Sequence, residues 1–242
     1  MPKPQHIFFD LDNTLTRSRT LMAPAHQELF KELCAQKDVI VVTGGQVSQI
    51  QKQIPPAFTG EYIALSQSGN YAVAKDGSVL WSEQFSPEQK TAILGLIQAI
   101  RDEQKLVVQD ENDLVEDRGS QISYSLIGHH EDTGKKEAFD PGATKRLAIL
   151  ETHKEGVLKL RQVGADVRPG GTTTFDFTIA GKHKGFNITR LIEHEGWKKE
   201  DCLYIGDALF PGGNDETVIG IIPTQPVKDQ NETFDFISSN LL

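Results

Sequence analysis

The sequence is poor in several features that would mark particular classes of protein. It has two cysteines, Cys34 and Cys202, and both lie in apolar patterns typical of core residues in a reduced compartment. No apolar run approaches a membrane span, and the first residues lack the apolar core of a signal peptide. Lysine and arginine together number 25 against 34 acidic residues, and a net charge of −9 argues against a nucleic-acid partner. These absences favour a cytoplasmic protein that binds neither membrane nor nucleic acid.

The most informative motif is a pair of carboxylates, Asp10 and Asp12, that follows the short apolar run Ile7–Phe9. The run is too short for a helix and indicates a buried strand, and ligands of open α/β sheets bind beyond the carboxyl ends of such strands. Two carboxylates this close repel each other unless a cation lies between them or one is protonated. The pair therefore predicts a magnesium site, a nucleophile with an acid/base partner, or both; an acidic turn without function is the alternative.

Three further motifs combine strand or helix ends with groups suited to phosphate or metal. The β-branched run Val39–Val42 ends in Thr43 and Gly44, a hydroxyl and a flexible loop that can hold a phosphate, although an ordinary glycine turn would look the same. Lys184 and Gly185 lead into the amphipathic segment Phe186–Glu195, and a cation at the start of a helix opposes the macrodipole unless an anion is near. Another apolar run ends in Gly206-Asp207 and leads through a glycine loop to Asn214 and Asp215.

These four motifs, in this order, resemble those of the haloacid dehalogenase superfamily of phosphotransferases. Within it the chain is similar to subfamily IIB, the Cof-type sugar phosphatases, and its Pro-Gly-Gly-Asn-Asp loop at 211–215 looks most like eukaryotic-type phosphomannomutases. The resemblance implies an α/β fold: a doubly wound, Rossmann-like core with an inserted α+β cap domain of C2 type, an antiparallel sheet plus helices. It places the catalytic core at 1–81 and 182–242 and the cap, which selects the substrate, at 82–181.

The local patterns agree with this fold class. The apolar runs predict core strands, and the helical periodicity predicts helices between them, an alternation typical of a doubly wound sheet. The expected core strands are Ile7–Phe9, Val39–Val42, Tyr62–Leu65, Leu203–Ile205 and Gly220–Ile222, with a hairpin of Tyr71–Ala74 and Val79–Trp81. The expected core helices are Pro24–Cys34, Val47–Gln53 and Phe186–Glu195.

The segment at 82–181 has a different pattern. Its expected helices are Pro87–Glu103 and Pro141–Val163, and its expected strands are Leu106–Gln109, Gln121–Ile127 and Thr173–Ile179. Several of these strands alternate polar with apolar residues, as one-faced antiparallel strands do. With 242 residues and 38% hydrophobic content the chain can bury two modest cores or a single one.

The resemblance also implies roles for individual residues. Asp10 would attack the phosphorus of a phosphate ester and Asp12 would exchange protons with the leaving and entering oxygens. Mg²⁺ would be bound by the Asp10 carboxylate, the Asp12 backbone carbonyl and Asp207, with Asp215 completing the acidic wall directly or through water. Thr43, the Gly44 backbone and Lys184 would hold the remaining phosphate oxygens, and Asn214 would orient Lys184 or Asp215 in the substrate site.

The sequence leaves two possible acceptors for the phosphoryl group, water and a sugar hydroxyl. Phosphomannomutases bind a second phosphate with several arginines of the cap. Only Arg118 matches one of these arginines, and His129 stands where another is expected. Asp176 matches a residue that contacts sugar hydroxyls in that group, and Arg19 can face the substrate or the solvent. We expect a phosphosugar hydrolase, with a phosphomannomutase or an inactive sugar-phosphate binder as alternatives. A homodimer through the cap is common in the phosphomannomutase group.

Overall fold

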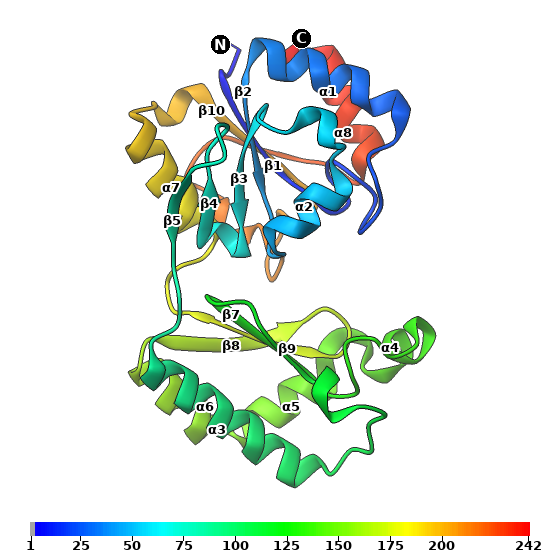
Figure 1. Cartoon of the computed structure of the whole chain (residues 1–242), viewed down its shortest axis with the longest axis vertical. Helices are drawn as coiled ribbons and strands as arrows, with labels where there is room; N and C mark the ends of the chain where they lie inside the picture. The colour runs from blue at the N-terminus through cyan, green and yellow to red at the C-terminus, as the bar shows by residue number, and fades with distance from the viewer. Residues whose placement is uncertain (1–2) are drawn as a thin grey trace. The chain divides into compact units, whose positions relative to one another are not determined.

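The computed structural model describes residues 3–242 of the chain; Met1 and Pro2, at the start of the N-terminal segment discussed above, lie outside them. Contacts between Cα atoms divide the described chain into two compact units (Figure 1). The core unit comprises the described residues up to Ser82 together with Lys182–Leu242, and the inserted unit is Glu83–Gly181. No helix among the described residues is both long and apolar enough to cross a membrane.

The core unit is built on a seven-stranded mixed sheet with the order β11-β10-β1-β2-β3-β4-β5. Strands β11, β10, β1, β2 and β3 are parallel, and the hairpin β4-β5 adds two antiparallel strands at one edge. Its strands are β1 (His6–Asp10), β2 (Asp38–Val42), β3 (Tyr62–Ser66), β4 (Tyr71–Val73), β5 (Val79–Ser82), β10 (Cys202–Gly206) and β11 (Thr224–Pro226). Its helices are α1 (Pro24–Gln36), α2 (Val47–Gln53), α7 (Lys184–Glu195) and α8 (Gln230–Phe236), with a π-helical turn at Ile237–Leu241.

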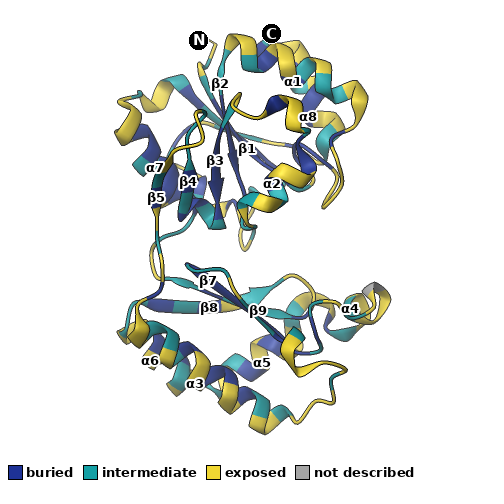
Figure 2. Ribbon diagram, in the orientation of Figure 1, coloured by how far each residue is buried: buried dark blue, intermediate teal, exposed yellow. Residues whose placement is uncertain are grey.

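Both faces of the central strands are covered, which explains their continuous apolar runs. Ile7 and Phe9 of β1 pack in one cluster with residues of α1, α2 and α8, whereas Phe8 packs on the other face with residues of α7. Figure 2 shows these strands as a buried layer between helices whose outer faces are exposed. Cys202 is buried on the α7 side, and Cys34 is partly buried against the opposite cluster, in line with the expectation that they are core residues.

The inserted unit is a four-stranded antiparallel sheet, with the order β6-β7-β9-β8, packed on helices. The apolar residues of β7 and β9 form one core with the buried faces of α3 and α6, while the alternate residues, such as Ser123 and Asp176, lie on the other face. Helix α3 begins with a capping box between Ser86 and Gln89. The elements are α3 (Pro87–Gln104), β6 (Val115–Asp117), β7 (Gln121–Ser125), α4 (Thr133–Phe139), α5 (Thr144–Thr152), α6 (Lys154–Gln162), β8 (Ala165–Gly170) and β9 (Thr174–Ile179).

The structure thus confirms the predicted fold class, and three predicted elements are wrong. The last core strand lies at Thr224–Pro226 and not at Gly220–Ile222, because Gly220 has a φ of 82° and turns the chain. The run Leu106–Gln109 forms no strand: it follows the left-handed C-cap Lys105 of α3, pairs with no strand and leaves Val107 almost fully exposed.

The third correction concerns the predicted helix Pro141–Val163, which is two helices, α5 and α6. They are separated at His153, whose φ of −94° and ψ of 22° end the first helix. The break lets each short helix bury its own apolar residues, Ile149 on α5 and Leu160 on α6, in the same cluster. The first three residues, Pro141–Ala143, form a short turn before α5, and the φ of 72° at Gly142 is not helical, so the turn does not continue the helix.

The contact between α1 and α8 includes His26, whose surroundings disfavour the charged form of its ring. The His26 ring stacks on Phe234 at 4.2 Å between ring centroids, and its buried Nδ1 has no hydrogen-bond partner among residues 3–242. Burial lowers the pKa of His26 below its usual value, and the attraction of Asp235 and Asp229 only partly opposes this.

We therefore expect acid to weaken this contact. A base with a lowered pKa in the folded state binds fewer protons there than in the unfolded state, so its contribution to stability is lost as the pH falls below about 6.5. The variant His26→Phe keeps the stacked ring without the titration. Denaturant unfolding from about pH 7.5 to pH 5 should show a smaller loss of stability for the variant than for the wild type. Parallel stability curves would contradict this.

Candidate active site

Several predicted site residues of the core unit come from the carboxyl ends of three neighbouring parallel strands. β1 lies between β10 and β2, and its last residue, Asp10, pairs in register with Val42 of β2. Thr43 directly follows β2, and Asp207 directly follows β10. The strand order therefore brings together side chains that lie far apart in the sequence, at the edge where open α/β sheets bind ligands.

The centre of this site is the Lys184 ammonium group, which is buried between two carboxylates. Its Nζ donates hydrogen bonds to Asp10 Oδ1 at 2.5 Å and to Asp215 Oδ1 at 2.6 Å. Lys184 is 2% exposed, Asp10 3% and Asp215 0%. Lys184 is the first residue of α7, and the next residue must be small, because a Cβ at Gly185 would collide with the backbone of Thr217. This close approach seats the start of α7 beside the segment that carries Asp215.

A tyrosine that the sequence analysis did not identify completes this cluster. The Tyr204 hydroxyl donates to Asp215 Oδ1 at 2.6 Å and lies 3.3 Å from Lys184 Nζ. Burial, followed by the charge of Asp215, raises the pKa of Tyr204 well above its usual value, so the hydroxyl keeps its proton. The only sequence signal was its place in β10, two residues before Gly206, where it points to the same face as Phe8.

The charges of the cluster do not balance without a further cation. Burial raises the pKa of Asp10 to about 7; Lys184 opposes the rise, and Asp215 adds to it. Burial disfavours the Lys184 ammonium, but Asp10 and Asp215 outweigh this and raise its pKa. The pKa of Asp207 is also raised, first by burial and then by Asp215. When all three carboxylates are ionised, they and the one ammonium carry an excess of two negative charges.

Three of these carboxylates are placed to bind a metal ion. Asp10, Asp207 and Asp215 each offer an oxygen, and these oxygens lie within 4.8 Å of one another. Oxygen-only ligands suit hard cations such as Mg²⁺ or Ca²⁺, and a divalent ion would cancel the excess charge. The Asp207 amide donates to the Thr14 hydroxyl at 3.1 Å, which ties the β10 loop to the loop after β1. The donor set therefore fits a divalent cation.

The Asp12 carboxylate is not part of this cluster and is held by a different set of donors. Gln49 Nε2 donates to its Oδ2 at 2.7 Å, and Gln53 Nε2 and the Arg19 backbone amide donate to its Oδ1 at 3.3 and 2.8 Å. Arg19 has a left-handed backbone with a φ of 56°, and its residue is exposed. Arg19 therefore contacts Asp12 through its backbone amide.

In the phosphate-binding loop predicted after β2, Thr43 is buried and the space beside Gly44 is empty. Thr43 is 3% exposed, and its Oγ1 accepts a hydrogen bond from the Gly45 amide at 3.1 Å. A Cβ added at Gly44 would meet no atom within 4 Å. Asn214 is exposed, whereas the hydrogen bonds of Lys184 go to Asp10, Asp215 and Tyr204.

Two predicted site residues, Arg118 and Asp176, lie in the inserted unit. Arg118 Nε and Nη2 both donate to Glu116 Oε2, at 3.1 and 2.5 Å. Asp176 Oδ1 accepts from the Ser123 hydroxyl at 2.8 Å on the neighbouring strand. His129, where the resemblance led us to expect an arginine, lies with Nδ1 3.8 Å from Glu116 Oε1. Glu116 therefore lies close to both Arg118 and His129.

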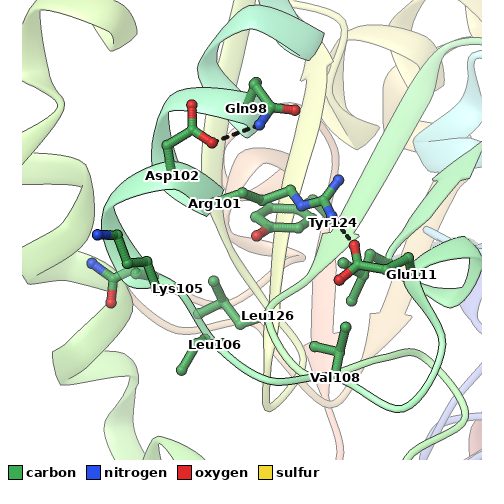
Figure 3. Close-up of a pocket in the computed structure, with 11 residues that line it drawn as sticks. Gln98, Arg101, Asp102, Lys105, Leu106, Val108, Glu111, Tyr124 and Leu126 are labelled. Carbon is green, nitrogen blue, oxygen red and sulfur yellow. Dashed lines mark hydrogen bonds and ion pairs between the residues drawn. The ribbon is translucent and has the colours of Figure 1, made fainter.

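The inserted unit also contains a cavity of about 260 Å³ on the side of its sheet that faces the helices. Figure 3 shows Tyr124 and Leu126 at this cavity, with an ion pair between Arg101 and Glu111 beside them. Tyr124 alternates along β7 with Ser123, so the cavity lies on the opposite face from Ser123 and Asp176. Of the described residues that line it, none is a predicted site residue.

Comparisons with known proteins find relatives of this chain by sequence and by fold. Phosphomannomutase 1 of Dictyostelium discoideum is 26% identical over 241 residues, covering 95% of this chain and 94% of that protein. The phosphomannomutase of Schizosaccharomyces pombe is 27% identical over 226 residues, covering 86% of this chain and 82% of that protein. A haloacid dehalogenase-like hydrolase from Bacteroides thetaiotaomicron has the same fold, with a TM-score of 0.68 over 98% of this chain and 99% of that one, at 14% identity.

The family model for haloacid dehalogenase-like hydrolases matches residues 7–215, which spans the carboxylate pair, the strand-end threonine, the buried lysine and the acidic cluster. An N-terminally truncated IMP-nucleotidase of Plasmodium falciparum matches the fold with a TM-score of 0.66, 14% identity, and coverage of 99% of this chain and 70% of that one. The chain therefore belongs to the haloacid dehalogenase-like hydrolase family, as a phosphohydrolase or phosphotransferase.

Proposed function

We propose that this protein is a magnesium-dependent phosphohydrolase that acts on a phosphorylated sugar through an aspartyl-phosphate intermediate. The observation that carries the proposal is the buried ammonium of Lys184, held between Asp10 and Asp215 at the carboxyl end of the sheet. A protein that only binds its ligand has no need of a buried carboxylate, Asp10, poised beside a second one, Asp12. The inactive sugar-phosphate binder is therefore the weakest alternative.

The chemistry assigns Asp10 and Asp12 different parts. An Asp10 carboxylate oxygen attacks phosphorus, the bond from phosphorus to the ester oxygen breaks, and Asp12 gives its proton to the leaving alcohol. A water molecule then attacks the phosphorus of the aspartyl-phosphate, Asp12 takes a proton from it, and inorganic phosphate leaves with Asp10 regenerated. The hydrogen bond from Lys184 opposes the rise in the Asp10 pKa and so supports the ionised Asp10 that the attack requires.

Mg²⁺ would be held by Asp10, Asp207 and Asp215, with the Asp12 backbone carbonyl as a further ligand. When bound, it offsets the repulsion between the Asp10 carboxylate and the phosphate dianion. Thr43, Gly44 and Lys184 would hold the other phosphate oxygens, and the open space at Gly44 supports this role. We also propose that Asn214, in the exposed loop before Asp215, contributes to the substrate site.

Hydrolysis is favoured over mutase action by the charges in the inserted unit. A mutase must bind the phosphate that is not being transferred, which calls for free guanidinium groups. Arg118 is already engaged by Glu116, and His129 approaches the same carboxylate. Losing one charged contact costs about 1.5–3 kcal/mol, so a bisphosphate would bind much more weakly than in a site with the full set of arginines.

Phosphomannomutase activity is the second candidate. Curated relatives that span most of this chain are named as phosphomannomutases. Asp176, bonded to Ser123 on the polar face of the inserted sheet, supports contact with sugar hydroxyls. Arg19 is a further candidate for the substrate through its side chain. A cytoplasmic location and a homodimer through the inserted unit remain part of the proposal.

The first prediction separates the candidate functions. With Mg²⁺ and hexose monophosphates, we expect steady release of inorganic phosphate without exchange of 1- and 6-phosphates, because water is the acceptor. Asp10→Asn should abolish release, since the amide is not a nucleophile, while binding of the sugar phosphate remains. Phosphate release and isomer formation are measured together, with and without a hexose bisphosphate. Interconversion that depends on the bisphosphate would establish the mutase instead.

The second prediction concerns the ammonium. Lys184→Met leaves Asp10 and Asp215 buried without their cation, so without divalent ions we expect the free energy of unfolding to fall by about 3–5 kcal/mol. Denaturant unfolding measures this, with the exposed Lys199→Met as the control. Added Mg²⁺ should restore part of the lost stability, because it supplies positive charge to the same carboxylates. Equal stability of the two variants would refute the assigned role.

A further inference from the structure

Helix α2 presents two glutamine amides to the Asp12 carboxylate. Gln49 and Gln53 are four residues apart, so they lie on the same face of the helix, and both Nε2 atoms donate to Asp12, at 2.7 and 3.3 Å. Gln53 is 1% exposed, and its Oε1 accepts the Thr16 hydroxyl at 2.5 Å. With its oxygen occupied by Thr16, the Gln53 amide turns its N–H groups towards Asp12.

The backbone of the loop after β1 supplies the third donor. The Arg19 amide donates to Asp12 Oδ1 at 2.8 Å, so each carboxylate oxygen has at least one donor. The same loop is closed by the Ser18 amide, which donates to Asn13 Oδ1 at 3.3 Å. A carboxylate held at both oxygens from two separate segments has little freedom to rotate.

Gly45 gives Gln49 the space to reach Asp12. A Cβ built at Gly45 would overlap the Gln49 side-chain amide, and the three atoms nearest to it all belong to Gln49. Gly45 is not among the glycines with a positive φ, so an alanine would fit the backbone there. The glycine after the Thr43-Gly44 pair is therefore explained by the path of the Gln49 side chain and not by the turn.

We propose that Gln49 and Gln53 are positioning residues that hold the Asp12 carboxylate where it exchanges protons with the leaving and entering oxygens. The inference rests on the proposed function, in which Asp12 is the acid/base group. Neutral amides suit the task, because a lysine would form an ion pair with Asp12 and a glutamate would add charge beside the acidic cluster.

The experiment compares two phosphate esters in the first turnover with Mg²⁺. Mannose 6-phosphate has an alkoxide leaving group that needs a proton, whereas 4-nitrophenyl phosphate has a leaving group that departs without one. For Gln49→Met we expect the first turnover of mannose 6-phosphate to slow by about 10- to 100-fold, a part of the about 10²–10⁴ that acid–base catalysis contributes, with KM unchanged. The first release of nitrophenol should keep its wild-type rate.

Two further variants sharpen the test. Gln51→Met changes an exposed glutamine on the same helix and should leave both substrates unaffected. Gly45→Ala keeps Gln49 but blocks its path, so it should reproduce the selective loss on mannose 6-phosphate. Its melting temperature should stay near that of the wild type, because only a flexible side chain must move.

The outcomes distinguish a failure of the positioning role from a failure of the proposed function. Equal losses on both esters for Gln49→Met, or behaviour like that of Gln51→Met, would overturn the positioning role while the active wild type left the proposed function in place. A wild type that releases neither phosphate nor nitrophenol would overturn the proposed function and the inference with it. A selective loss in both Gln49→Met and Gly45→Ala supports the role.

Discussion

The structure of the site depends on one buried charge, the Lys184 ammonium between Asp10 and Asp215. The hydrogen bond to Asp10 joins residues 174 positions apart, and the bond to Asp215 spans 31 more. Removing the lysine leaves two buried carboxylates without their cation, and this is far more costly than losing an exposed ion pair. The arrangement therefore fixes the start of α7 against the ends of β1 and β10 before any ligand binds.

Around this charge the core separates two kinds of carboxylate. Asp10, Asp207 and Asp215 lie together, and their repulsion favours a cation, whereas Asp12 is held apart by neutral amides and a backbone amide. Two acids one residue apart in the sequence thereby acquire different environments. Differences of this kind give two neighbouring carboxylates different affinities for a proton and for a cation.

Much of the core could be predicted from the sequence, because central strands buried on both faces must be continuous apolar runs. The two strands that were missed, β6 and β8, are both at edges of the inserted sheet, and β8 contains Pro169, which an edge strand tolerates. In the site, the motif residues could be named, but Tyr204 and Gln49 could not. A tyrosine in a strand and a glutamine on a short helix match many roles, and only the fold brings their polar atoms to a carboxylate.

The return of the chain to the core at Lys182 has a consequence for biosynthesis. Asn70 donates to the Lys182 carbonyl at 3.0 Å, and Asn187 donates to the Ser68 carbonyl at 2.9 Å. These bonds join the N-terminal and C-terminal segments of the core, and the first of them lies two residues before the buried lysine. The inserted unit is one uninterrupted stretch and can fold as soon as the ribosome has released it. Asp10, in contrast, stays without its lysine until that unit has been synthesised, and Asp207 and Asp215 follow later still, so the nascent core acquires its site last.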